Sequence, residues 1–145
     1  MPRRVFLSLQ SGTIFFKFLE RENSPKYYFS DNGILNLFLD KKESRLLENI
    51  VAITLFNRYG DGVFYLKGKS ADVDFFVEDT GEAIQVSFSY DNISNDRETE
   101  NLLRIAASFK EAKRFLIIKE HEEKELTLDG VKIEVIPCWK FLLSH

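Results

Sequence analysis

Cysteine, proline and glycine are all scarce in this chain. Its 145 residues include one cysteine, three prolines and seven glycines. The lone cysteine, Cys138, excludes an intramolecular disulfide and any metal site built from several cysteines, and it is typical of a protein kept reduced in the cytosol. So few glycines and prolines leave no long linker, and no segment repeats. We therefore expect one domain with a real hydrophobic core.

The chain also lacks any run of the roughly 18 apolar residues needed to cross a bilayer. Arg3 and Arg4 precede apolar residues, as in a signal peptide, but Gln10 and Lys17 interrupt the run and no small-residue cleavage site follows. These features predict a cytoplasmic protein with no membrane partner. The formal net charge of −3 means that no global positive field attracts nucleic acid, so only a local basic patch could do so.

The sequence alternates between helix-like and strand-like periodicity. Asp40 and Glu43 fit a capping box for the first helix, Gly60 fits its end, and Glu98 fits the capping role in the second. The pattern predicts, in order, an aromatic strand at 26–29, a helix from Asp40 to about Tyr59, strands at 62–67, 72–78 and 83–89, a helix beginning after Asn95, strands at 114–119 and 131–136, and a short closing helix after Pro137. This order predicts an α/β fold whose mixed central sheet is flanked by helices. Because a helix joins them, the strands at 83–89 and 114–119 are expected to be parallel.

The turn at residues 79–82 predicts a hairpin register. With the turn centred between its two middle residues, Asp74 lies opposite Ser87 and Phe76 lies opposite Gln85. Strict alternation then places an apolar set on one face of the second strand of the meander: Val73, Phe75 and Val77. Four polar side chains are expected together on the other face of the sheet: Asp72, Asp74, Gln85 and Ser87.

This element order resembles the core of the restriction-endonuclease-like, or PD-(D/E)XK, nucleases. Such nucleases carry an acidic residue on the first helix, an Asp on the second strand and Glu-x-Lys on the third. Here Glu48 and Asp74 stand at the first two positions. Gln85-Val86-Ser87 stands where Glu-x-Lys would lie. The resemblance implies a nuclease fold with a degenerate motif.

A closer resemblance is to the C-terminal, nuclease-like domain of unknown function in archaeal and bacterial AAA-type ATPases. It rests on an ordered set of short segments: 26–33, 46–51, 65–67, 73–75, 84–87 and 135–137. The resemblance implies that residues 25–145 form this domain and that residues 1–24 are a remnant or arm of a missing upstream module. The chain contains no Gly-x-x-x-x-Gly-Lys-Ser/Thr loop, so ATP binding is not expected here.

The resemblance implies a site that would hold Mg²⁺ against a phosphodiester in an active member of the family. Asp74 is the first candidate ligand, and Glu48 and Asp72 are expected to assist. Gln85 is neutral where an anionic ligand is needed, so Mg²⁺ should bind weakly. Ser87 offers no positive charge to the developing phosphorane.

Two lysines on or just after the neighbouring strand, Lys67 and Lys69, are candidates to replace the missing charge and to contact nucleic acid. Structural roles compete with these assignments. Glu48 could pair with Arg45 one helical turn away, and Gln85 with its neighbour at 87 could form local hydrogen bonds.

Three functions follow. The favoured one is a catalytically degenerate nuclease-like domain that supports an ATPase module or binds a nucleic-acid or protein partner. The second is an active Mg²⁺-dependent DNA endonuclease that uses Asp74, Glu48 and a displaced lysine. The third is homo-oligomerisation through the aromatic segment 15–19, if it is exposed. No small-molecule cofactor is indicated.

Overall fold

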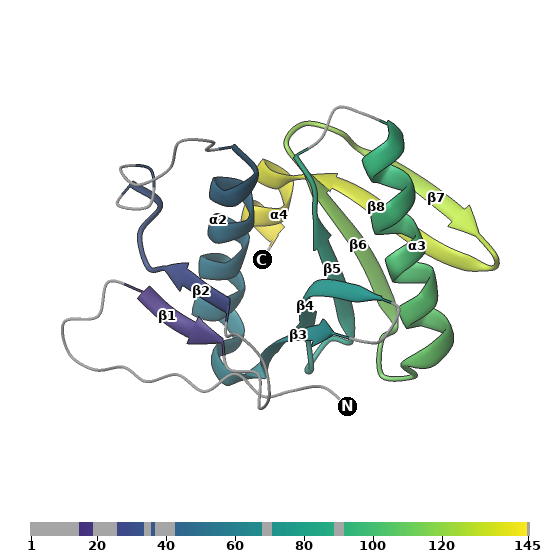
Figure 1. The fold of residues 1–145 in the computed structure, drawn as a ribbon, viewed down its shortest axis with the longest axis horizontal. Coiled ribbons are helices and arrows are strands. Elements are labelled where there is room, and N and C mark those ends of the chain that lie inside the picture. Colours follow the sequence, from purple (N-terminus) through teal and green to yellow (C-terminus); the bar gives the residue numbers. More distant parts are fainter. Residues whose placement is uncertain are drawn as a thin grey trace.

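The computed structural model describes residues 15–18, 26–33, 36, 43–67, 71–88 and 92–144, and only the backbone of 15–18, 26–27, 67 and 92–96. Within these ranges the chain is an α/β protein with a mixed six-stranded sheet between helices (Figure 1). The predicted α/β class is therefore confirmed. Residues 68–70 contain Lys69, and 37–42 contain Asp40, so both of these assignments lie outside the described residues.

The elements follow in the order β1 (Phe15–Phe18), β2 (Lys26–Phe29), α2 (Glu43–Tyr59), the 3-10 turn η1 (Gly60–Gly62), β3 (Val63–Lys67), β4 (Asp72–Val77), β5 (Glu82–Val86), α3 (Asn92–Ser108), β6 (Arg114–Lys119), β7 (Lys124–Leu128), β8 (Val131–Pro137) and α4 (Cys138–Ser144). The sheet order is β3-β4-β5-β6-β8-β7. The strands β3, β4 and β5 form an antiparallel meander, and β5, β6 and β8 run parallel. The expected parallel pairing across the helical crossover is thus confirmed. In a separate hairpin, β1 pairs antiparallel with β2.

Helices cover both faces of the sheet (Figure 1). On one face α2 and α4 pack over a core that includes Val51, Leu55, Phe75, Ile118 and Phe141. On the other face α3 packs over a second core that includes Leu102, Ile105, Phe76, Ile117 and Ile133. The sheet is therefore buried on both sides, which is why its central strands read as nearly continuous apolar runs.

Helix α2 supplies the first core with residues spaced four apart. Leu47, Val51 and Leu55 are buried along one face of the helix, and Val51 and Leu55 belong to that core. The helix ends at Tyr59 because Gly60 takes a positive φ of 52°, a conformation that glycine adopts without a Cβ clash.

The amide of Asn49 fastens β2 to this helix. Its Nδ2 donates to the Phe29 carbonyl at 3.0 Å, and its Oδ1 accepts from the Phe29 amide at 2.8 Å. The same Nδ2 lies 2.9 Å from Oδ1 of Asn32. Asn49 is 2% exposed, so the side chain replaces a missing strand partner in a dry environment. Segments 26–33 and 46–51, two of those that carry the family resemblance, therefore contact each other.

The predicted start of α3 is wrong. The helix begins at Asn92 instead of after Asn95, so Glu98 lies in its second turn and is not a capping partner. A strand was also missed: β7 lies between the two strands that were predicted at 114–119 and 131–136. Only Leu126 and Leu128 of its five residues are apolar, so the alternation is too short to indicate a strand.

The predicted hairpin register is wrong by two residues. Phe76 lies opposite Ala83 instead of Gln85, because the turn occupies residues 78–81. At Gly81 φ is 69°, and a Cβ there would lie 2.8 Å from the Glu111 carbonyl oxygen. Only glycine fits that position, and it places the turn one residue earlier along the chain than expected.

Among the described residues, no helix is long and apolar enough to cross a membrane. The exposed large apolar side chains in this part of the chain are Leu128, Trp139 and Leu143. The aromatic segment 15–19 was predicted to form an apolar patch, but its side chains lie outside those described.

Candidate functional site

The strands β4 and β5 separate at the residues to which the sequence assigned a site. Their backbone pairing runs from Val77 and Glu82 to Phe75 and Ile84, where it stops. On the other side of β4 the register with β3 shifts between Phe64 and Leu66, which leaves two residues of β4 opposite one of β3. This bulge breaks the alternation of β4 at Asp74 and Phe75.

The bulge corrects the predicted faces of β4. Val73 and Phe76 belong to the same core, on the α3 side, while Phe75 and Val77 belong to the α2 side. Val73 was expected on the face of Phe75 and Val77, so that assignment is wrong. Asp72, next to Val73, therefore points away from the α3 side, where Ser87 lies, and the predicted four-residue polar face does not form.

Side chains close the opening between β4 and β5. The Gln85 Oε1 accepts from the Asp74 amide at 3.0 Å, and its Nε2 donates to the Asp72 carbonyl at 2.9 Å. In return the Asp74 Oδ2 accepts from the Val86 amide at 3.0 Å. Gln85 is 5% exposed, so its side-chain amide forms, inside the protein, the hydrogen bonds that a backbone amide of β5 would otherwise make. These bonds join the two strands where the backbone ladder has ended.

On the α2 side of this opening stands a buried tyrosine. The Tyr28 hydroxyl donates to Oε1 of Glu48 at 2.6 Å, and its ring lies 5.6 Å from that of Phe75. Burial, and then the Glu48 carboxylate, raise the pKa of the Tyr28 phenol far above its ordinary value, and the charge of Asp74 raises it further. Glu48 and Asp74 therefore both lie close to this phenol.

On the α3 side lie three buried polar residues, Ser87, Glu98 and Lys119, which are 4%, 8% and 5% exposed. The Ser87 amide donates to the Ile118 carbonyl at 2.9 Å, which continues the parallel register of β5 and β6. Ser87 and Lys119 are thus neighbours on adjacent strands with side chains on the same face. Each strand ends at this point, at the same edge of the sheet.

Glu98 reaches this edge from α3. Burial raises the pKa of its carboxyl above the ordinary value, and the nearby Asp74 charge adds to the rise, while the Ser87 hydroxyl and the Lys119 ammonium oppose it. Neither Ser87 Oγ nor Glu98 Oε2 meets hydrogen-bond geometry with any atom of the described residues. Two buried polar groups thus face each other with unused bonding capacity, which is costly unless something else satisfies them.

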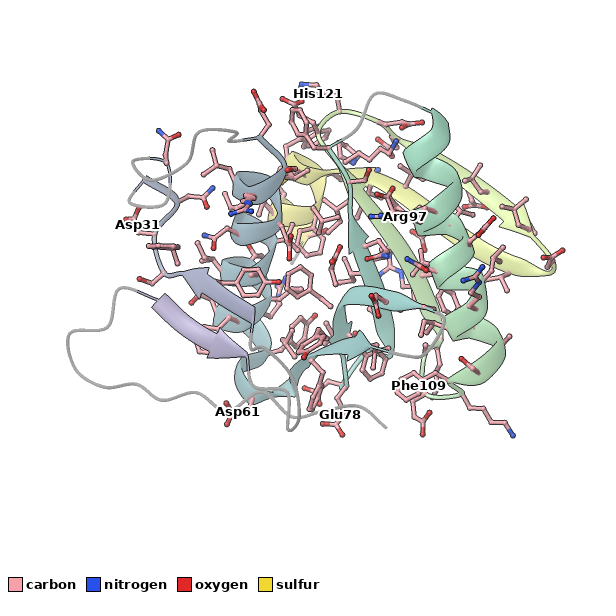
Figure 2. The ribbon with its side chains drawn as sticks, in the orientation of Figure 1. Asp31, Asp61, Glu78, Arg97, Phe109 and His121 are labelled. Atoms are coloured by element: carbon pink, nitrogen blue, oxygen red, sulfur yellow. The ribbon has the colours of Figure 1, made fainter. Side chains whose placement is uncertain are left out.

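Lys119 is paired with the loop that follows its strand. Its Nζ lies 2.8 Å from Glu122 Oε2, and the Nζ of Lys124 lies 2.5 Å from Oε1 of the same carboxylate. The hydrogen bond from Lys119, and then that from Lys124, lower the pKa of Glu122. His121 of this loop and Arg97 of α3 lie toward the same end of the molecule, opposite Glu78 in the β4–β5 turn (Figure 2).

The structure gives the predicted site residues different surroundings. Glu48 and Asp74 each lie close to the Tyr28 phenol. Gln85 forms the local hydrogen bonds that were the alternative to a site role. Asp72 is exposed and contributes its carbonyl oxygen. The side chain of Lys67 and the whole of Lys69 lie outside the described residues, so their predicted contact with nucleic acid stays a prediction.

Within the described part of the chain, no three Asp, Glu, His or Cys side chains gather closely enough to hold a metal ion. Gln85 uses both ends of its amide on the β4 backbone, and an oxygen of Asp74 is used by Val86. The side chains described here therefore do not fit the Mg²⁺ site that the family resemblance implies.

Glu98 and Lys119 belong to this site, and sequence reasoning missed both. Glu98 matched a capping pattern, and Lys119 was read as the last residue of a strand. A signal did exist for Lys119, because in parallel strands the residue at the end of β6 must lie beside the end of β5. Glu98 gave no such signal, since its burial depends on where α3 begins.

Comparison with known proteins gives little further guidance. An uncharacterised protein of Haemophilus influenzae is 31% identical over 121 residues, which cover 81% of this chain. The chain spans 29% of the length of that relative, so the match concerns one part of a longer protein. No family model matches the chain, and no solved structure matches it.

Proposed function

We propose that this chain is a nuclease-like α/β domain of the restriction-endonuclease-like class that has lost hydrolysis and acts as a binding or regulatory module. In this proposal its partner is a nucleic acid, or the ATPase module or other protein that such domains accompany.

The arrangement of the elements supports the class. A helix, an antiparallel meander, a second helix and a parallel strand follow one another, and Glu48, Asp74 and Gln85 occupy the helix, the second strand and the third strand of that core. The longer Haemophilus relative agrees with a domain that also occurs inside longer chains.

The observation that carries the loss of hydrolysis is the Gln85 bridge. A catalytic carboxylate at this position must face solvent and metal, whereas the Gln85 amide is buried and bonded to the β4 backbone at both ends. A glutamate here could accept from the Asp74 amide, but it would repel the Asp72 carbonyl. The strand pair is built around a neutral amide, and that is incompatible with a metal ligand at this point.

A cleavage assay tests the proposal. The wild type and Asp74→Ala are incubated with single-stranded, duplex and branched DNA in the presence of Mg²⁺ or Mn²⁺. We expect no cleavage by either protein beyond a buffer control. Cleavage by the wild type that disappears in Asp74→Ala would show an enzyme and refute the proposal.

One observation favours a second function, an active metal-dependent nuclease with relocated charges. The carboxylate missing at Gln85 and the ammonium missing at Ser87 both have counterparts nearby, in the buried Glu98 and Lys119. Under this alternative, wild-type cleavage would be lost in Glu98→Gln and in Lys119→Met. The exposed Glu100→Gln, two residues away on α3, is the matched control and should cleave like the wild type.

A further inference from the structure

Two lysines converge on one carboxylate at the end of β6. Each oxygen of Glu122 contacts a different ammonium group, that of Lys119 at 2.8 Å and that of Lys124 at 2.5 Å. An oxyanion held through two oxygens by two cations is also the arrangement in which lysines hold a phosphate group. The Glu122 carboxylate therefore occupies a position in which a phosphate group of a ligand could bind.

The two sides of this contact differ in freedom. The Lys119 side chain is 6% exposed and comes from a central strand, whereas those of Glu122 and Lys124 are 37% and 39% exposed. Glu122 lies in the loop between β6 and β7, so it can swing out without disturbing the sheet. Its departure would remove the ion pair of the buried Lys119 ammonium and leave it near only the Glu98 carboxyl, whose charged form burial disfavours, so another anion would be favoured there.

A third hydrogen-bond donor, the hydroxyl of Ser87, lies on the strand next to Lys119. The hydroxyl of Ser87 points to the same face from the neighbouring strand and is almost fully buried; it lies close enough to the Glu98 carboxyl to lower its pKa, but it meets hydrogen-bond geometry with no atom of the described residues. While Glu122 binds the two lysines, the Ser87 hydroxyl donates to neither of its oxygens. An anion with more than two oxygens could accept from Ser87 as well as from both lysines.

We propose that Ser87, Lys119 and Lys124 form a phosphate-binding subsite that Glu122 occupies as an intramolecular competitor, and that the phosphodiester group of a nucleic acid displaces it. This inference rests on the proposed function, for which it names the ligand and the means of control. It assigns nucleic acid, and not a protein, as the partner.

The neighbouring charges select among phosphates. Glu98 lies near Lys119, and Asp74 lies near Glu98, so both carboxylates add negative charge to the surroundings of the subsite and repel an anion. A phosphodiester carries a single negative charge, whereas free phosphate or a phosphomonoester carries close to two at neutral pH. The repulsion is therefore smallest for a diester. Free inorganic phosphate should bind more weakly than an oligonucleotide.

The test measures binding of a fluorescent oligonucleotide, single-stranded or duplex, by anisotropy at low salt. Removing the competitor in Glu122→Gln should increase affinity about tenfold over the wild type, since a charge-assisted contact becomes free for the ligand. Glu123→Gln is the matched control. It removes the same charge from the next residue, whose partner is Lys140 on α4, and should change affinity by less than about twofold.

Two further variants identify the donors. Lys124→Gln and Ser87→Ala, each combined with Glu122→Gln, should lose most of the gain. Circular dichroism confirms that every variant is folded. Equal affinities of Glu122→Gln and Glu123→Gln would overturn the subsite, because the gain would then reflect net charge alone. Inorganic phosphate that competes as well as the oligonucleotide, mole for mole, would overturn the assignment to a diester.

The outcomes separate this inference from the function on which it rests. If the wild type cleaves nothing and Glu122→Gln gains no affinity, the subsite is refuted and the proposal of a degenerate module stands. If the wild type cleaves DNA through Asp74 and Glu122→Gln gains affinity, the loss of hydrolysis is refuted and the subsite stands.

Discussion

The strand β5 buries polar groups at both of its ends, and the two ends are built differently. At the first end Glu82 is 2% exposed and accepts from Arg114 at 2.6 Å and from Thr80 at 3.1 Å. Arg114 also bonds Glu134 at 3.1 Å through two nitrogens. At the second end the Ser87 hydroxyl and the Oε2 oxygen of Glu98 meet hydrogen-bond geometry with no atom of the described residues. At the first end the charged groups pair with one another, whereas at the second end two buried polar oxygens could still form hydrogen bonds.

The electrostatics of the two ends differ in the same way. At the first end Arg114 lowers the pKa of Glu134, and Glu134 raises that of Arg114, so the structure favours the charged forms. At the second end burial raises the pKa of Glu98, so the structure disfavours its charge. Burial alone therefore does not mark a functional residue. The combination of burial with missing partners does, because a purely structural network tends to be completed.

Breaking the completed network around Glu82 should destabilise the protein most. Arg114→Met leaves Glu82 buried without its cation, so the free energy of unfolding should fall by about 3 kcal/mol, the usual cost of a stranded buried charge. Urea unfolding followed by circular dichroism measures the change. A loss below about 1 kcal/mol would mean that solvent reaches Glu82 and that the two ends differ less than the structure indicates.

The next effect concerns the bridge at the second end. Gln85→Ala removes both bonds of the amide and leaves the Asp74 N–H and the Asp72 carbonyl unpaired, so stability should fall by about 2 kcal/mol. The same unfolding experiment applies. If the loss is negligible, water replaces the amide and the opening between β4 and β5 is wet.

A gain in stability is expected from Glu98→Gln. The raised pKa means that the folded state holds the Glu98 proton more tightly than the unfolded chain does. Glu98 therefore costs stability as the pH rises above the ordinary carboxyl pKa. At pH 8 the variant should be more stable than the wild type by about 1 kcal/mol, and near pH 4 the two should converge.

Unfolding curves at both pH values check this, with Glu100→Gln on the exposed side of α3 as the control. A variant with the same stability as the wild type at every pH would show that Glu98 is satisfied when charged. The second end would then be as complete as the first.

The smallest effect is expected where a charge pair is exposed. Lys140→Gln breaks the pair with Glu123, and both side chains are about half exposed, so stability should change by no more than about 0.5 kcal/mol. Thermal unfolding checks it. A larger loss would mean that exposed pairs in this protein also matter, and that the contrast between the ends of β5 is one of degree.

Much of the fold could be predicted because local patterns dictate it. The stop at Gly60 predicted the end of α2, and the helical crossover predicted the parallel pairing of β5 and β6. These depend on periodicity and chirality, which the sequence carries directly. The edge strand β7 was not predicted, since four of its five residues are exposed and Leu126 is the one that packs against the core.

The site was harder to predict because it depends on one irregularity. Strict alternation would put Asp72 and Asp74 together, but the bulge at Asp74 breaks it, and no residue of β4 announces a bulge. The two-residue error in the hairpin had a different cause, the close approach of Gly81 to the Glu111 carbonyl, which is a tertiary contact. Such contacts between distant segments have no local signature.

The amides of Asp74 and Val86 lie in the middle of a sheet, yet side chains instead of the opposite backbone hold their protons. Proton exchange at most central amides requires the strands to part, whereas at these two positions a rotation of Gln85 or Asp74 is enough. Deuterium uptake should therefore be faster at these two sites than at their strand neighbours. Their rates would report any event that disturbs the opening while the remainder of the sheet stays protected.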